Sequence, residues 1–173
     1  MASIIKSNTY ADFNGREILT ADSNGNLTTQ KTLYPAFSAY LTADQSVADS
    51  TVAKVNLDAE LFDTDSAFDI SNSRFTVPAG KAGKYVFQSA VSYVNLTNED
   101  QGQARIHKNG TVQVYVNGYQ GQNGSITYQC VETIDLDVGD YIEIYAYQVS
   151  GGAISVDGGS AYLTYLKGFR VGS

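Results

Sequence analysis

The run of residues 85–94 constrains the fold of this chain more than any other stretch. It reads Tyr-Val-Phe-Gln-Ser-Ala-Val-Ser-Tyr-Val, and its aromatic and β-branched residues favour a strand. A shorter apolar piece at Phe75 precedes it, across a gap (residues 78–83) that contains one Pro and two Gly, as turns do. This order of strand, turn and long strand predicts a β-sheet protein in which Phe87 and every second residue beside it face the core.

Further strand-like runs, separated by turn signals, fill the chain from Tyr34 onward. Asn109-Gly110 is the strongest hairpin signal. The predicted strands are residues 36–41, 52–57, 74–77, 84–94, 104–108, 111–116, 125–136, 141–149 and 161–171, with a compact turn at 137–140 and a Gly- and Ser-rich loop at 151–159. Because no window shows a sustained helical period, we expect an all-β fold: an antiparallel two-sheet sandwich of about eight to ten strands, of jelly-roll type.

Residues 1–33 differ in character from residues 34–173, which places a domain boundary between them. The first segment holds turn signals at Asn14-Gly15 and at residues 22–26. Its scattered apolar residues are Ile4, Ile5, Phe13, Ile18 and Leu19. Because they are too few to form a core of their own, residues 1–33 are predicted to fold against residues 34–173, against their copies in an oligomer, or against another protein. Exposed strand edges would supply main-chain hydrogen bonds there, and these five residues are the candidates for docking.

Charge and hydropathy exclude several classes of partner. The net charge of −7 and the absence of any Lys- or Arg-rich run argue against nucleic acid, which requires a basic surface. No segment approaches the roughly 20 apolar residues of a membrane-spanning helix, so we expect no membrane insertion. The first residues also lack the apolar core of a signal peptide, so secretion by the Sec pathway is not expected.

The residues that usually carry chemistry are scarce. The chain has one histidine, His107, and one cysteine, Cys130. They form no catalytic constellation and no zinc spacing, so we expect no enzyme, no cofactor and no metal. His107 is interpreted as a surface strand histidine, and Cys130 as a small buried hydrophobe. A group of acids is interpreted as a solvated loop rather than a calcium site or a glycosidase pair; it comprises Asp58, Glu60, Asp63, Asp65 and Asp69.

A stretch rich in Tyr, Gly, Gln and Asn is the candidate binding loop. Its candidate residues are Tyr115, Tyr119, Gln120, Gln122, Asn123 and Tyr128. Flat aromatic faces beside adaptable amides are the means by which many carbohydrate- and protein-binding loops hold their ligands. The alternative is an ordinary long hairpin whose tyrosines pack against another subunit.

Several motifs of residues 34–171 resemble the complement-q head domain of the TNF-like jelly-roll superfamily. The spaced motif comprises Leu57, Asp63, Phe68, Phe75, Gly83, Tyr85 and Phe87. The opening strand, the Lys-Asn-Gly hairpin, the Gly-Asp turn and the closing strand also resemble that family, at residues 35–39, 106–110, 139–142 and 164–169. Three features depart from the pattern: Leu57 replaces a Phe, the link from Phe75 to Gly83 is longer, and Ser89 replaces an aromatic. The resemblance implies a jelly roll that assembles as a homotrimer and binds a ligand.

The N-terminal segment resembles a second group of proteins. Residues 3–9, Asn14-Gly15 and residues 22–28 are similar to the start of bacteriophage fibre and virion surface proteins. This resemblance implies a location on the virion surface, as a fibre, spike or decoration protein, with capsid or tail proteins and host glycans or proteins as partners. One alternative is a free secreted or bacterial lectin-like module. A less favoured alternative is a polysaccharide-degrading enzyme, because trimeric enzymes of that kind usually have a larger chain with a groove of paired acids.

Overall fold

The computed structural model describes residues 9–11, 13, 17–21, 24, 27–29, 35–159 and 162–172, which form strands, turns and loops. The chain divides into two compact units, Met1–Leu33 and Tyr34–Ser173. The first unit contains a three-stranded antiparallel sheet of β1 (Thr9–Ala11), β2 (Glu17–Ala21) and β3 (Leu27–Thr29). Within the described residues, no helix is long and apolar enough to span a membrane.

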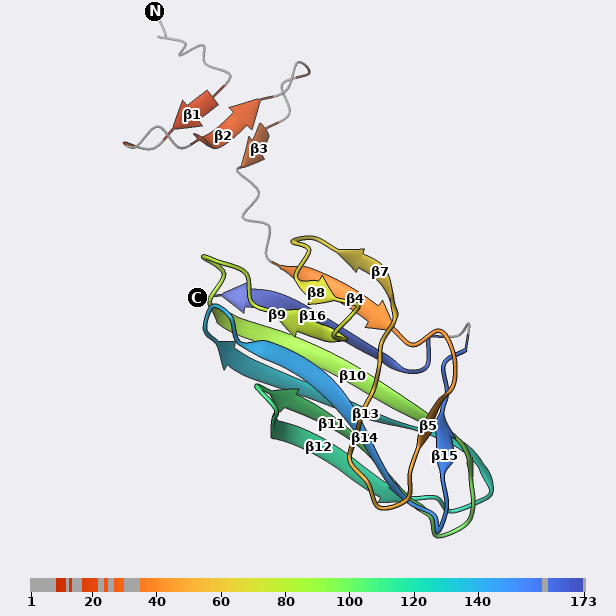
Figure 1. Cartoon of the computed structure of the whole chain (residues 1–173). Coiled ribbons are helices and arrows are strands. Elements are labelled where there is room, and N and C mark those ends of the chain that lie inside the picture. The colour runs from red at the N-terminus through yellow and green to blue at the C-terminus, as the bar shows by residue number, and fades with distance from the viewer. Residues whose placement is uncertain are drawn as a thin grey trace, which may run out of the picture. The chain divides into compact units, whose positions relative to one another are not determined.

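The second unit, the head, is built from two sheets (Figure 1). Sheet I has the order β5-β15-β10-β16-β4-β7, and β13 pairs along the other edge of β10. Its strands are β4 (Ala36–Tyr40), β5 (Gln45–Val47), β7 (Ala59–Asp63), β10 (Gly83–Leu96), β13 (Gly124–Leu136), β15 (Ile154–Val156) and β16 (Tyr165–Gly172).

Sheet II has the order β12-β11-β14-β9-β8, with β6 paired to β14. Its strands are β6 (Ala53–Lys54), β8 (Phe68–Asp69), β9 (Arg74–Thr76), β11 (Gln101–Lys108), β12 (Thr111–Tyr119) and β14 (Tyr141–Val149). Every pairing in the two sheets is antiparallel. The predicted all-β fold of two antiparallel sheets is therefore confirmed.

The Asn109-Gly110 hairpin forms as predicted. β11 and β12 pair directly on either side of it, and both turn residues have positive φ, 51° for Asn109 and 78° for Gly110. Two positive φ values are the mark of the tight hairpin turn that follows the twist of the strands. The turn at residues 137–140 plays a different role, because it carries the chain from β13 in sheet I to β14 in sheet II.

Two strand predictions need correction. The predicted loop at residues 151–159 contains β15, whose residues pair with β5 about a hundred positions earlier, as Ile154 does with Val47. The predicted strand at 52–57 shortens to β6, although Val55 and Leu57 are fully buried as expected. In both cases a long-range partner, rather than local sequence, sets the length of the strand.

The core between the sheets contains a cluster of aromatic rings. Phe37 stacks on Phe75 with ring centroids 4.8 Å apart, and Phe87 lies within 6.4 Å of both. The cluster accounts for four of the motif residues that resemble the complement-q family, since Phe68, Phe75, Tyr85 and Phe87 all belong to it. Asp63 explains another position, because its carboxylate accepts a hydrogen bond from the Phe68 amide at 2.7 Å and fixes the entry to β8.

The predicted phase of the long strand is confirmed. Tyr85, Phe87, Ser89, Val91 and Tyr93 share the core-facing side of β10, and all are fully buried. Opposite Phe87 stands Gly168 of β16, where an added Cβ would lie 2.6 Å from the phenyl ring. A glycine is therefore required there by close approach rather than by backbone conformation.

Candidate functional site

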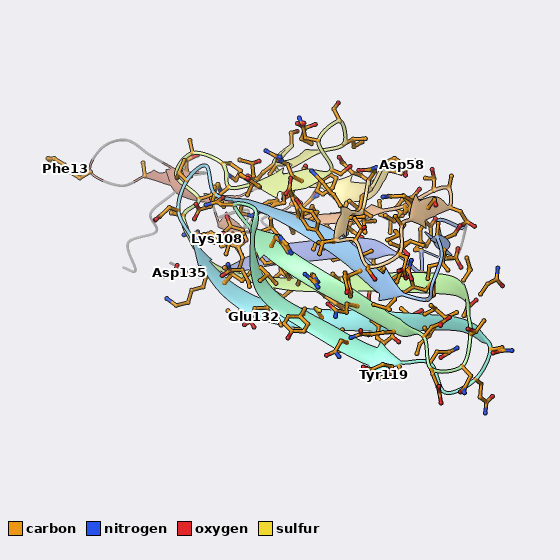
Figure 2. The ribbon with its side chains drawn as sticks, turned by 60° about the horizontal axis from the view of Figure 1, so that its bottom comes forward. Phe13, Asp58, Lys108, Tyr119, Glu132 and Asp135 are labelled. Carbon is orange, nitrogen blue, oxygen red and sulfur yellow. The ribbon has the colours of Figure 1, made fainter. Side chains whose placement is uncertain are left out.

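The predicted binding-loop residues separate into two groups. Tyr115 and Tyr119 are 57% and 69% exposed on β12, and Gln122 and Asn123 are exposed in the loop that follows. In Figure 2, Tyr119 lies at the end of β12 remote from Lys108.

Tyr128 and Gln120 are buried, so the structure does not display them on the surface beside Tyr115 and Tyr119. The Tyr128 ring packs between the sheets beside Gly102 and Gly118, and its hydroxyl donates to the Gly118 carbonyl at 3.0 Å. The sequence held a signal for this position, because Tyr128 shares the alternation of Cys130 and Ile134, which are also buried.

The two exposed tyrosines belong to a wider surface, the outer face of sheet II. Along β12, Tyr115, Asn117 and Tyr119 alternate with residues that pack toward the core. The register places them opposite Arg105, Gln103 and Gln101 of β11, in that order. The outer face therefore carries two tyrosines and one asparagine on β12 beside one arginine and two glutamines on β11; we call these six residues the β11–β12 strip.

Arg105 is held in place within this strip. Its Cζ lies 5.7 Å from the centroid of the Tyr115 ring and 5.0 Å from that of the Tyr147 ring on β14. Its Nε donates a hydrogen bond to Oε1 of Gln103 at 2.9 Å. Two cation–π contacts and one hydrogen bond fix a side chain that otherwise has many rotamers. Sequence reasoning missed both Arg105 and Tyr147, because only the register across three strands brings them together.

Glu143 lies on the same face of β14 and is buried. Its Oε1 is 2.6 Å from Lys54 Nζ and 2.7 Å from Arg74 Nη2, and its Oε2 accepts a hydrogen bond from the Tyr145 hydroxyl at 2.9 Å. Burial alone would raise the pKa of this carboxyl. The hydrogen bonds from Lys54 and Tyr145, together with the charges of Lys54 and Arg74, outweigh burial and lower the pKa below its ordinary value.

His107 is buried rather than on the surface, which corrects the sequence-based interpretation. It is 8% exposed, and its ring stacks on Tyr145 with centroids 4.1 Å apart. Nδ1 lies 3.2 Å from the Gly110 carbonyl oxygen. Burial lowers the pKa of His107, against the raising effect of the hydrogen bond to Gly110. Because the imidazole is buried and stacked on a tyrosine ring, it has a packing role.

The lowered pKa values of Glu143 and His107 predict that the protein loses stability in acid. Because the pKa of each is lowered in the folded state, the unfolded chain binds protons more readily, and stability falls as the pH drops below about 6.5 for His107 and about 4.5 for Glu143. Glu143→Gln is expected to lose about 1–3 kcal/mol at pH 7, since Lys54 and Arg74 lose their carboxylate. Urea unfolding between pH 7 and pH 3 should show a shallower acid slope for this variant than for the wild type; an equal slope would contradict the assignment.

The remaining sequence candidates have structural roles. Cys130 is buried and donates through Sγ to the Ala104 carbonyl at 3.1 Å, and burial raises the pKa of its thiol. The five acids do not form one loop, which corrects their interpretation, because Glu60 and Asp63 lie in β7 and Asp69 lies in β8. Asp58 accepts hydrogen bonds from the Thr42 amide and hydroxyl, while Asp69 accepts from Asn72. Within the described ranges, no group of three or more His, Cys, Asp or Glu is arranged to hold a metal ion.

A second surface, the outer face of sheet I, is apolar. Phe62, Val131 and Phe169 are 52%, 63% and 50% exposed there. They come from β7, β13 and β16, and they line a hollow of about 380 Å³ together with Ala36, Phe37, Val86, Gln88, Lys167 and Gly168. We call this surface the sheet I hollow.

Comparison with solved structures settles the fold. The globular domain of the zebrafish complement 1qA protein matches with a TM-score of 0.56 at 18% identity, over 80% of this chain and 98% of that one. The Eiger TNF of S. frugiperda matches with a TM-score of 0.62 at 8% identity, over 81% and 94%. Murine APRIL at pH 8.0 matches with a TM-score of 0.60 at 16% identity, over 80% and 99%.

The head has the complement-q and TNF-like jelly-roll fold. No protein-family model matches the chain, and no curated protein matches it. The likeness to solved structures extends to the fold and supports the resemblance of residues 34–171. None of the three proteins named above is a phage protein, so the virion resemblance of the N-terminal segment stays a prediction.

The candidate docking residues of the N-terminal unit are partly described. Phe13 is fully exposed in the connection between β1 and β2. Ile18 and Leu19 lie in β2, while Ile4 and Ile5 lie outside the described residues. Their role in docking stays a prediction.

Proposed function

We propose that the protein is a non-enzymatic binding module that assembles as a homotrimer, with the sheet I hollow as the contact between subunits and sheet II facing outward. The observation that carries the proposal is the group of half-exposed apolar side chains Phe62, Val131 and Phe169 around one hollow. Contiguous apolar patches of this kind mark association sites on soluble proteins. Because each side chain is already about half-buried, covering the rest of each is worth about 1–2 kcal/mol.

A second copy of the chain is the occupant that fits this surface. The hollow lies on the outer face of sheet I, and its lining includes Gln88 and Lys167 beside the apolar residues. The Lys167 ammonium lies 4.2 Å from the Tyr165 ring, so its charge is already partly accommodated. The number of copies, three, comes from the complement-q family that the sequence resembles.

The N-terminal unit is assigned the role of attachment. It forms a compact unit of its own, with three short strands and an exposed Phe13. Short sheets with free edges gain affinity by pairing with strands of a partner. On the resemblance of residues 3–28, the partner is a capsid or tail protein and the location is the surface of a bacteriophage virion. The alternative is a free secreted or bacterial lectin-like module, which would need no docking partner.

Mass and truncation together test this proposal. Light scattering of the full chain is expected to give roughly 56 kDa, three times the chain mass of 18.6 kDa. Residues 32–173 expressed alone are expected to keep the β-sheet spectrum and the trimeric mass but to lose binding to particles that lack the protein. A monomeric mass would overturn the trimer, and truncated heads that decorate particles as well as the full chain would overturn the docking role.

A further inference from the structure

The β11–β12 strip combines exposed aromatic rings with polar groups in a regular array. Tyr115 and Tyr119 stand four residues apart on an edge strand, about 13 Å along β12. Asn117 is exposed between them. Facing this row, Arg105, Gln103 and Gln101 repeat in the same register on β11. Gln103 is buried and holds Arg105. A ligand lying along β12 would therefore meet the Tyr115 and Tyr119 rings for stacking, and Asn117, Gln101 and Arg105 for hydrogen bonds.

Arg105 differs from the other cations of this face. Lys54 and Arg74 both pair with the buried carboxylate of Glu143. Among the described residues, Arg105 has no carboxylate partner, and its one hydrogen bond uses Nε, which leaves both Nη atoms free of protein acceptors. A guanidinium fixed between Tyr115 and Tyr147 and aimed by Gln103 presents an open fork of donors, the arrangement that binds a carboxylate through two parallel hydrogen bonds.

The charge of the surface points the same way. The chain carries a net charge of −7, yet across β11, β12 and β14 the one acid is Glu143, which is buried and paired. Exposed carboxylates that would repel an anion are thus absent from these three strands. An anionic group that reaches the strip gains a charge-assisted hydrogen bond without displacing an existing ion pair.

We propose that the β11–β12 strip binds a linear glycan that carries carboxylates, such as a chain of uronic acids, with one carboxylate on Arg105 and sugar rings against Tyr115 and Tyr119. Asn117 and Gln101 hydrogen-bond the hydroxyls, for which amides suit because they both donate and accept. The inference rests on the proposed binding function and deepens it by naming the ligand class.

The test compares how tightly the full chain binds acidic sugars and their uncharged esters. Isothermal titration would use tetrasaccharides of galacturonic acid and of mannuronic acid, together with their methyl esters, which keep the rings and remove the charge. At least one acid is expected to bind, and its ester is expected to bind about tenfold or more weakly. Arg105→Gln is expected to weaken binding of the acid by about the same factor. Tyr115→Ala is expected to weaken it several-fold, because one aromatic ring no longer stacks on the sugar.

Matched controls separate the strip from general charge and aromatic effects. Lys81→Gln removes a cation, and Tyr162→Ala removes an exposed tyrosine. Neither residue belongs to the β11–β12 strip, so each variant is expected to bind like the wild type. Arg105→Lys keeps the charge but not the fork, so it is expected to recover part of the lost affinity. Far-ultraviolet spectra establish that each variant is folded.

The inference would be overturned if no acidic tetrasaccharide binds, if acid and ester bind equally, or if Arg105→Gln binds like the wild type. Capture of protease-sensitive cell-surface material by the strip, without sugar binding, would assign a protein ligand and also overturn it. The mass of the same samples keeps the two proposals apart. A trimer that binds no acidic sugar refutes the glycan alone, whereas a monomer that binds one refutes the subunit interface alone.

Discussion

Replacing Phe87 by alanine is expected to lower the free energy of unfolding by about 3–5 kcal/mol. The ring is fully buried at the centre of the aromatic cluster, in contact range of Phe37, Phe75 and Tyr85. The substitution removes the transfer free energy of the ring and leaves a cavity that the stacked neighbours fill poorly, because both sheets hold them in place. Urea unfolding at constant protein concentration measures the loss.

Val112→Ala serves as the control for this experiment. Val112 is half-exposed on the edge strand β12, so its truncation is expected to change stability by about 0.5 kcal/mol or less. If Phe87→Ala unfolded at the same urea concentration as the wild type, the core-facing phase of β10 and its register with β13 and β16 would be wrong.

The sequence was most informative where strands are long and turns carry their own signal. The run at 85–94 fixed β10 and its buried side because aromatic and β-branched residues persist over the whole strand. Asn109-Gly110 fixed the β11–β12 hairpin because a turn with two positive φ values selects these residues. In both cases the determining interactions act between residues close in the chain, so the local sequence is enough to predict the structure.

Short strands and surface sites could not be predicted because their partners are remote in sequence. β5 and β15 have three residues each, and β15 is held between β5 and β10, both distant in the chain. Arg105 gives no signal of its own; it becomes a candidate site only when β12 and β14 bring a tyrosine to each side of it. His107 was placed on the surface because nothing near it in sequence announces the covering Tyr145 ring. Register between distant strands is the missing information in each case.

Replacing Phe169 by glutamate is expected to convert the proposed trimer into a folded monomer. Phe169 is 50% exposed at the rim of the sheet I hollow and pairs in register with Val86 and Ala36, so its ring would be covered by a neighbouring subunit. A carboxylate there would have to be desolvated in each of three contacts, without a partner built for it. The head itself should stay folded, because the side chain points away from the core. Light scattering and far-ultraviolet circular dichroism report the two properties separately.

Val138→Glu introduces the same charge at an exposed apolar residue of the turn at 137–140 and is expected to remain trimeric. If both variants dissociate, net charge rather than the sheet I hollow governs assembly; if neither does, the subunits meet elsewhere.

The Phe169→Glu monomer also separates assembly from ligand binding. The β11–β12 strip lies on the opposite sheet, so each monomer is expected to bind a soluble acidic tetrasaccharide with the affinity of the wild type. Binding to a surface coated with the same sugar should fall by about a hundredfold or more, because a trimer that engages several sites at once gains avidity that a monomer lacks. A monomer that lost the soluble sugar as well would place the binding site at the subunit contact, and the division of roles between the two sheets would be wrong.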